Sequence, residues 1–347
     1  MSPRSSTDDF LDTDLDEYTG RLPAIKNTSE KKNGKRKGER LTQPASPDIS
    51  EMLRQEGAIE QLEFSYTPSR HEREWMMASL SGYYNAHWFT DVLKVIRGGK
   101  EASVYLLEGH PSAPAPLIAG KIYRPRRFRN LKKDHLYREG RDNLDIDGNI
   151  IHDGRMQRAM QHKTHFGQEL LHTSWIGHEF QTMQTLHEAG ADIPEPFASG
   201  NNAILMGYIG DRDLAAPTLD TVELGPAEAR QLFQRVLFNI ELMLAHARVH
   251  ADLSAYNILY WQGEITLIDF PQAIDPHQNR SAFRIFERDV LRVCEYFSRQ
   301  GVKSNPRKLA VDLWTRFKYR TQPEPDPHYL DDSSPEDRVY WENTQDK

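Results

Sequence analysis

The segment HADLSAYNILYWQGEITLIDF, at 250–270, places two carboxylates and an amide, Asp252, Asn257 and Asp269, among apolar residues. A Gln-Gly pair predicts a turn between two short antiparallel strands, which would bring Asn257 and Asp269 to the same edge. Side-chain oxygens suit a hard cation such as Mg²⁺, or Mn²⁺ in its place, which binds through one or two carboxylates plus substrate phosphates. Asp252 precedes the hairpin and would be free to orient or deprotonate an acceptor hydroxyl. We therefore expect Asn257 and Asp269 to be metal ligands and Asp252 to be a catalytic residue.

A phosphate-binding segment should accompany such a metal site. Gly98, Gly99 and Lys100 lie between two expected strands and offer backbone amides that can approach a phosphate closely. Two glycines there are also typical of an ordinary turn. Lys121 lies among apolar strand residues, where an ammonium group is costly unless it meets anions, and Glu179 on an expected helix could supply one of them. Taken singly, each has a simpler interpretation, an edge lysine that reaches solvent and a solvent-facing helix residue.

The elements that must position these residues separate into a strand-rich half and a helix-rich half. Hydrophobic periodicity in the first half predicts two helices, four strands and a long polar insert at 126–164 that is part loop and part short helix. The helices are expected at 72–85 and 172–189, and the strands at 92–97, 102–108, 116–124 and 202–210. The second half predicts a helix at 226–248, the hairpin, and a helix at 282–299. We expect an N-lobe at 66–205 and a C-lobe at 206–320.

Composition limits the cellular setting and the partners. The net charge of -7 argues against a surface built as a whole to bind nucleic acid or anionic membrane. A single cysteine, Cys294, excludes an intrachain disulfide, and no apolar run is long enough to cross a membrane. We therefore expect a cytoplasmic protein without a membrane contact.

Both ends of the chain have the composition of disordered tails. Residues 1–65 change from an acidic run to a basic one, Lys31–Arg40, and residues 321–347 are acidic and rich in proline. The basic run could contact RNA or a ribosomal particle, although a solubilising, flexible segment explains its composition equally well.

Six motifs in order, GGKEASVY, GKIYR, WIGHEF, ILMGYIG, HADLSAYNILYW and LIDF, resemble those of the RIO family of atypical serine/threonine protein kinases. The resemblance runs from about residue 72 to residue 299, and the DFPQA sequence resembles the bacterial branch of that family. It implies an α+β, bilobal protein-kinase-like fold that uses ATP and Mg²⁺ to phosphorylate a protein substrate or itself. An aspartyl-phosphate at Asp269 is a further implication.

The resemblance also implies a role for each matching residue. Lys121 would bind the α and β phosphates of ATP, with Glu179 as its partner on a helix, and His250 would hold the catalytic loop by hydrogen bonds. Asp252 would be the catalytic aspartate, and Asn257 and Asp269 the metal ligands. The remaining nucleotide contacts would come from a phosphate loop and an adenine-binding hinge, formed by Gly98, Gly99, Lys100 and Ser103, and by Met206, Gly207 and Ile209.

The sequence departs from ordinary protein kinases after Asp269. Phe270-Pro271 replaces Phe-Gly, and proline restricts the backbone that flips in those enzymes. Only some ten residues separate Pro271 from the next expected helix, too few for a regulated activation segment. Efficient phosphorylation of other proteins is therefore less expected than slow autophosphorylation on serine or threonine.

Three other functions compete with a protein kinase. A small-molecule phosphotransferase of the aminoglycoside type shares the H-x-D, Asn and IDF arrangement but lacks the GKEA.VY loop. An ATPase that acts in ribosome assembly, as in archaeal and eukaryotic relatives, is weakly supported by Lys31–Arg40. A zinc hydrolase could use His246 and His250 at i, i+4 spacing, but Ala247 replaces the expected base and no third ligand is evident.

Overall fold

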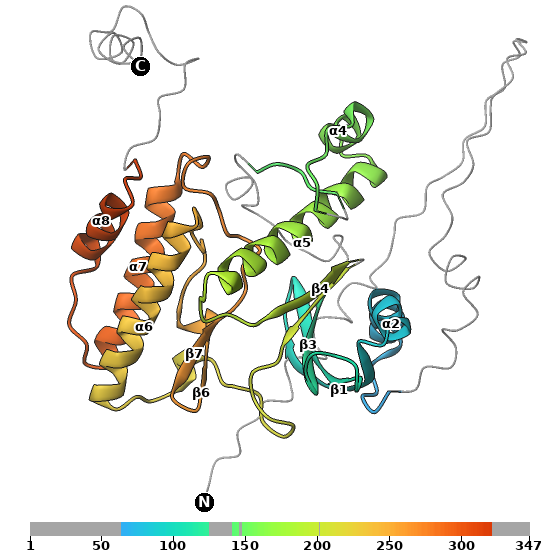
Figure 1. Cartoon of the computed structure of the whole chain (residues 1–347), viewed down its shortest axis with the longest axis horizontal. Helices are drawn as coiled ribbons and strands as arrows, with labels where there is room; N and C mark the ends of the chain where they lie inside the picture. The colour runs from blue at the N-terminus through green and yellow to red at the C-terminus, as the bar shows by residue number, and fades with distance from the viewer. Residues whose placement is uncertain (1–63, 125–140, 146–147, 201, 321–347) are drawn as a thin grey trace, which may run out of the picture. The chain divides into compact units, whose positions relative to one another are not determined.

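The N-lobe is built on an antiparallel sheet of five strands in the order β1-β2-β3-β5-β4 (Figure 1). The computed structural model describes residues 64–124, 141–145, 148–200 and 202–320. The strands are β1 (Phe89–Gly98), β2 (Ala102–Gly109), β3 (Leu117–Tyr123), β4 (Pro196–Gly200) and β5 (Ala203–Gly207). Three of the four predicted strands match β1, β2 and β3 closely, and the fourth, at 202–210, contains β5.

Helix α2 (Arg70–Asn85) packs on one face of this sheet. Its first turn is fixed by a capping box, in which the Ser69 side chain accepts from the Glu72 backbone amide and the Glu72 side chain accepts from Ser69. Met76, Leu80 and Tyr83 of α2 bury themselves against alternate residues of β2 and β3. The helix predicted at 72–85 is therefore confirmed, with a start two residues earlier.

Helix α5 (His165–Glu188) covers the other face of the sheet and reaches the C-lobe core (Figure 1). Thr164 caps its start by accepting from the Gly167 amide, so α5 begins seven residues before the predicted residue 172. Helix α4 (Gly154–Gln161) precedes it and confirms the short helix expected in the polar insert. Gly190 ends the α5 region with φ +83°, a conformation that favours glycine.

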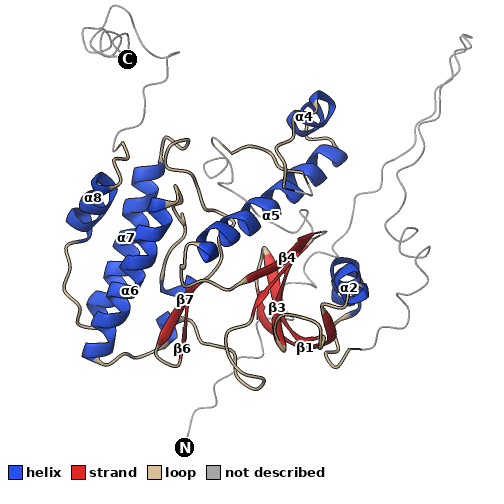
Figure 2. Cartoon of the chain, viewed as in Figure 1, coloured by secondary structure: helices blue, strands red, loops and turns tan. Residues whose placement is uncertain are grey.

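The C-lobe consists mainly of helices (Figure 2). They are α6 (Pro226–Ala245), α7 (Ala282–Arg299) and α8 (Pro306–Arg316), with single turns η3 (Leu219–Thr221) and η4 (Ala255–Asn257). One two-stranded sheet, β6 (Ile258–Trp261) and β7 (Glu264–Leu267), accompanies them. The core contains large buried side chains such as Phe233, Phe297 and Trp314. The α7 bounds match the prediction, and the expected α+β bilobal fold is confirmed.

Strand β4 and helix α8 were not predicted, nor were the single turns η3 and η4. Pro196 begins β4, an edge strand where proline costs no ladder hydrogen bond. Helix α8 begins with Pro306 at its first turn, and Asn305 caps it by accepting from the Lys308 amide.

Several predictions concern residues outside the described ranges. These are the disordered tails, apart from Phe64 and Ser65, the basic run Lys31–Arg40, and part of the insert at 126–164. Ser65 donates its backbone amide to Asp91 at the start of β1, at 2.8 Å, so the last residues of the expected N-terminal tail contact the sheet. The domain bounds otherwise stay predictions.

Candidate active site

Lys121 joins the two lobes through a pair of carboxylates. It lies on β3, and its Nζ is 2.6 Å from Glu179 Oε1 on α5 and 2.6 Å from Asp269 Oδ1 after β7. Tyr123 donates its hydroxyl to the other oxygen of Glu179. The Glu179 side chain is fully buried, whereas 44% of the Asp269 side-chain surface is exposed. The solvent-facing interpretations of Lys121 and Glu179 are therefore wrong.

The charges of this cluster depend on one another. Burial alone would lower the pKa of Lys121, but the carboxylates of Asp269 and Glu179 outweigh it and raise that pKa. Burial raises the pKa of Glu179 despite the nearby ammonium group. Burial would also raise the pKa of Asp269, but the Lys121 charge outweighs it and keeps that pKa below its usual value. The charged forms of Lys121 and Asp269 are therefore favoured.

The hairpin brings Asn257 and Asp269 to neighbouring positions, as expected. Ile258 pairs with Leu267, and the Ile268 amide donates to the Asn257 carbonyl at 3.0 Å. The turn residues Gln262 and Gly263 both have positive φ, which is the geometry of a two-residue hairpin turn. Asp269 itself has φ +73°, an uncommon conformation for an aspartate, and such conformations concentrate at functional sites.

Asp252 is held from two sides. Asn257 Nδ2 donates to the Asp252 carbonyl at 2.9 Å and to its side-chain Oδ2 at 3.3 Å. On the other side, Arg292 Nη1 of α7 lies 2.9 Å from Asp252 Oδ1. About two fifths of the Asp252 side-chain surface is exposed, so the carboxylate remains open to a substrate.

His250 makes hydrogen bonds that fix the backbone around Asp252. Its Nε2 donates to the Ile268 carbonyl at 3.1 Å, and its Nδ1 accepts from the Asp252 amide at 3.4 Å. The ring packs against Phe270, and burial lowers the pKa of His250, so the neutral imidazole is favoured. The hydrogen-bonding role expected for His250 fits this geometry.

The zinc-site alternative has no structural basis. Helix α6 ends at Ala245, and Ala247 has φ +53°, so His246 and His250 do not share a helical face. Within residues 64–124, 141–145, 148–200 and 202–320, no cluster of three or more His, Cys, Asp or Glu residues is arranged to hold a metal. A site that uses the amide oxygen of Asn257 as a ligand is not of this kind, because asparagine is not among these four residue types.

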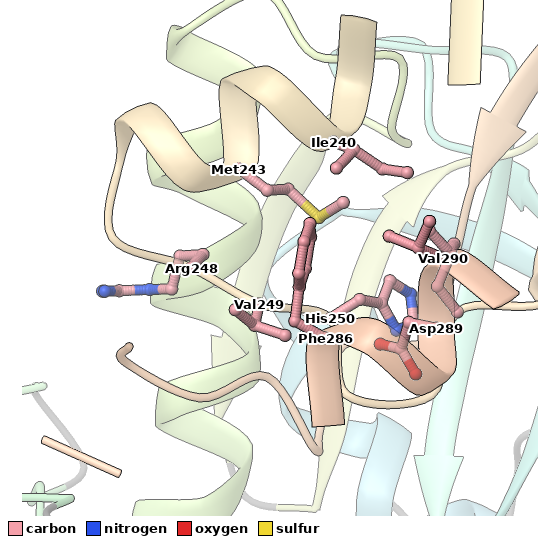
Figure 3. Close-up of a pocket in the computed structure, with 9 residues that line it drawn as sticks. Ile240, Met243, Arg248, Val249, His250, Phe286, Asp289 and Val290 are labelled. Carbon is pink, nitrogen blue, oxygen red and sulfur yellow. The ribbon is translucent and has the colours of Figure 1, made fainter. Parts of the chain in front are cut away.

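Helix α7 contacts the backbone on either side of Asp252. Arg288 donates to the Ala251 carbonyl, and the buried Asp289 faces the Leu253 amide. Burial raises the pKa of Asp289 to about 7, and the neighbouring Arg288 offsets only part of this rise. Figure 3 shows Asp289 and His250 beside a small cavity lined with apolar side chains, and Asp289 Oδ2 has no hydrogen-bond partner.

The glycine loop has the backbone freedom that a phosphate-binding segment needs. Gly98 ends β1 and has open space around its Cα, whereas a Cβ on Gly99 would lie 2.8 Å from the Ala102 carbonyl oxygen. Lys100 is exposed. Ser103 differs, because strand alternation places it with Tyr105 on the face covered by α2, opposite to Lys121. Its buried hydroxyl faces α2, so a phosphate contact of Ser103 would have to come from its backbone, and its place in the phosphate loop stays a prediction.

The expected adenine-binding residues lie at the end of β5 and just after it. Met206 is buried and pairs with Ala119 of β3, in the same core cluster as Tyr123. The Gly207 amide donates to the Glu195 carbonyl at 2.8 Å, and the Ile209 carbonyl accepts from Ala216 at 3.0 Å. The adenine contacts expected of Gly207 and Ile209 stay predictions.

Two arginines at the site were missed. Arg292 contacts Asp252 as described above. Arg141 precedes α4 and donates to the carbonyls of Pro271 and Ala273, at 3.1 and 2.5 Å, so the insert holds the segment after Asp269. Neither residue differs in sequence from an ordinary surface arginine, so spacing alone gives no signal.

Comparison with known proteins identifies the family. Residues 147–309 match the RIO domain family. The RIO-type serine/threonine-protein kinase Rio1 of Thermoplasma acidophilum is 31% identical over 135 residues, which cover 39% of this chain and 69% of that protein. The chain belongs to the RIO family of serine/threonine protein kinases. Glu179, Asp252, Asn257 and Asp269 lie inside the matched domain, whereas the glycine loop and Lys121 precede it.

Other RIO kinases match over shorter shares of their length. The Rio1 kinase of Haloferax volcanii is 30% identical over 60% of this chain and 64% of that protein. Human serine/threonine-protein kinase RIO1 is 33% identical over 37% of this chain, which spans 23% of the human protein. These relatives are archaeal and eukaryotic, so the resemblance to the bacterial branch stays a prediction.

A solved structure of the Cydia pomonella granulovirus kinase PK-1 aligns with 73% of this chain and 86% of that chain, at 11% identity and a TM-score of 0.39. In the RIO chain, no helix among the described residues is both long and apolar enough to cross a membrane.

Proposed function

We propose that the chain transfers the γ-phosphoryl group of ATP to serine or threonine, on itself or on a protein substrate. The observation that carries this proposal is the contact of Lys121 with both Glu179 and Asp269, at 2.6 Å each, inside a RIO kinase. This arrangement supports the proposal, because the ammonium group would bind phosphates and the half-exposed Asp269 carboxylate would bind a cation.

The donor set fits Mg²⁺, or Mn²⁺ in its place. Asn257 and the ionised Asp269 are oxygen donors at neighbouring hairpin ends, and hard cations of this kind prefer oxygen ligands. When bound, the metal would neutralise charge on the β and γ phosphates. Lys121 would bind the α and β phosphates, while Gly98, Gly99 and Lys100 would cover the phosphates with their backbone amides.

The adenine ring would be recognised by backbone groups. The Gly207 carbonyl would accept from the adenine amino group, and the Ile209 amide would donate to a ring nitrogen. Met206 would limit the depth of the adenine site. Because backbone groups make these contacts, the side chains there can vary without loss of nucleotide binding.

Asp252 would orient the acceptor hydroxyl and take its proton. Its carboxylate is exposed enough to reach a substrate, and His250 and Asn257 fix its backbone through the bonds described above. No step requires His250 to titrate, since both of its ring nitrogens already take part in bonds to the loop.

Autophosphorylation suits the segment after Asp269. Pro271 and Ala273 are held by Arg141, and α7 begins at Ala282, so little chain remains for a docking platform. A ribosomal or RNA contact through Lys31–Arg40 is a further proposal that rests on composition alone.

An ATPase that acts through an aspartyl-phosphate is the second candidate. The Asp269 carboxylate is 44% exposed and its Oδ1 is fixed by Lys121, so the other oxygen could accept a phosphoryl group. The protein would then release phosphate to water instead of retaining it on a hydroxyl.

Incubation of the purified full chain with γ-labelled ATP tests these proposals. Asp252→Asn and Lys121→Ala should lose the label, whereas the exposed pair on α8 supplies matched controls, Asp312→Asn and Lys308→Ala. Acid-stable label would indicate phosphoserine or phosphothreonine, and hydroxylamine-labile label would indicate Asp269. Equal labelling of wild type, Asp252→Asn and Lys121→Ala would refute the kinase proposal.

A further inference from the structure

Arg292 makes an unusual contact for a helix arginine. It lies in the middle of α7, and its guanidinium reaches the catalytic loop, where Nη1 is 2.9 Å from Asp252 Oδ1. The side chains of both residues are about two fifths exposed, and ion pairs that solvent reaches add little to folding stability. A contribution to stability is therefore a weak explanation for the contact.

The contact completes a two-point attachment of the carboxylate. Asp252 Oδ1 faces Arg292, and Oδ2 faces the Asn257 amide at 3.3 Å. A carboxylate held at one oxygen can rotate about its terminal bond, since that torsion has a broad energy profile. A carboxylate held at both oxygens has a fixed plane, and each oxygen keeps a lone pair for an acceptor hydroxyl.

The support behind Arg292 is rigid. One turn earlier on α7, Arg288 donates to the Ala251 carbonyl, and Asp289 is buried under the same loop. The helix therefore contacts the backbone on either side of residue 252, at the Ala251 carbonyl and the Leu253 amide, as well as the side chain of Asp252. A planar guanidinium also fixes direction better than an ammonium group, because its donors form a rigid fork.

We propose that Arg292 is a positioning residue for phosphoryl transfer, which fixes the plane of the Asp252 carboxylate toward the acceptor hydroxyl. This inference rests on the proposed kinase function and concerns the same site. Arg292 acts on the transfer step and does not contribute to ATP binding, because its contact is with the acceptor-side carboxylate and not with Lys121 or the glycine loop.

The labelling assay tests this role through the rate at saturating ATP and the ATP concentration at half-maximal rate. Arg292→Ala should lower the saturating rate about 10- to 100-fold, since small losses of alignment cost factors of this size. The half-saturating ATP concentration should stay within about threefold of wild type, because uniform binding is retained. The saturating rate of Arg292→Lys should fall between those of wild type and Arg292→Ala. Arg284→Ala, an exposed arginine of the same helix, is the matched control and should behave as wild type.

Added guanidinium ion separates positioning from a folding defect. Millimolar guanidinium should restore part of the Arg292→Ala rate and should not restore Asp252→Asn. A saturating rate for Arg292→Ala within about twofold of wild type would overturn the inference. The inference would also be overturned if guanidinium did not restore the rate of Arg292→Ala and Arg292→Lys lost as much rate as Arg292→Ala. If wild type transferred no phosphate, the proposed function would fail as well, whereas an active wild type with an unaffected Arg292→Ala would overturn this inference alone.

Discussion

The buried carboxylate of Glu179 allows a quantitative test of the ion-pair cluster. In Glu179→Gln, Lys121 keeps Asp269 at 2.6 Å but loses one of its two ionic contacts. A hydrogen bond to a charged group contributes about 1.5–3 kcal/mol. Burial raises the pKa of Glu179, which means that its environment opposes the charge, so the neutral glutamine recovers part of this loss.

We therefore expect a small loss of stability and a larger loss of function. The free energy of unfolding should fall by about 1–2 kcal/mol, which corresponds to a melting temperature about 3–6 °C lower for a chain of this size. Lys121 would then pair with Asp269 alone and compete more strongly for the carboxylate that is proposed to bind metal. The Mg²⁺ concentration needed for half-maximal stabilisation by ATP should rise, and the labelling rate should fall about tenfold or more.

Thermal denaturation over a series of Mg²⁺ concentrations, with and without ATP, measures both effects. Glu188→Gln, an exposed glutamate at the end of the same helix, is the matched control and should match wild type. If Glu179→Gln matched Glu188→Gln in melting temperature, Mg²⁺ requirement and labelling rate, the Lys121 cluster would not have the role assigned to it.

Three further predictions concern stability. Burial lowers the pKa of His178 to about 4, so its contribution to the free energy of unfolding is present above pH 6.5 and is lost as the pH falls toward 4. His178→Gln should reduce this loss of stability by about 1–2 kcal/mol, a figure that allows for the partial exposure of the ring. Denaturant titrations at several pH values measure it. The pKa of Asp289 is raised to about 7, so its effect on stability has the opposite pH dependence: the free energy of unfolding is highest near pH 4 and falls as the pH rises through 7. Asp289→Asn should remove this fall of a few kcal/mol. An unchanged pH dependence in Asp289→Asn would contradict the raised pKa. In Gly167→Ala, the added Cβ would lie 1.9 Å from the Ala159 carbonyl oxygen, so the melting temperature should fall by about 5 °C or more. Gly154→Ala adds its Cβ in open space and should have the melting temperature of wild type.

The sequence predicted the features that depend on local patterns. Two short strands around a Gln-Gly turn were enough to place Asn257 beside Asp269, and apolar spacing located α7 at its observed bounds. The contacts between Lys121, Glu179 and Asp269 join β3, α5 and the end of β7, and the family resemblance was needed to connect them. The metal, nucleotide and acceptor roles of these residues stay predictions.

The features that the sequence did not reveal have physical reasons. Ser103 was assigned to the phosphate loop from its position in a motif, which does not say that its side chain shares one face of β2 with the buried Tyr105. Arg292 follows α7 periodicity like a solvent-facing residue, and only the tertiary path of the loop 40 residues earlier gives it a partner. Arg141 likewise depends on how the insert folds back, which no local pattern determines.

The hydrogen bonds from Arg141 to the Pro271 and Ala273 carbonyls should affect which inhibitors the chain can bind. Many kinase ligands enter a space that opens only when the aspartate and phenylalanine after the last strand exchange places. Here Phe270 is buried at 1% exposure, the next residue is proline, and Arg141 holds the carbonyls beyond it. We expect compounds that compete with ATP beside a fixed Asp269 to raise the melting temperature, and compounds that require the exchange to leave it unchanged. The selectivity for such compounds would then depend on Arg141, a residue of the insert that lies outside the Lys121, Glu179 and Asp269 cluster.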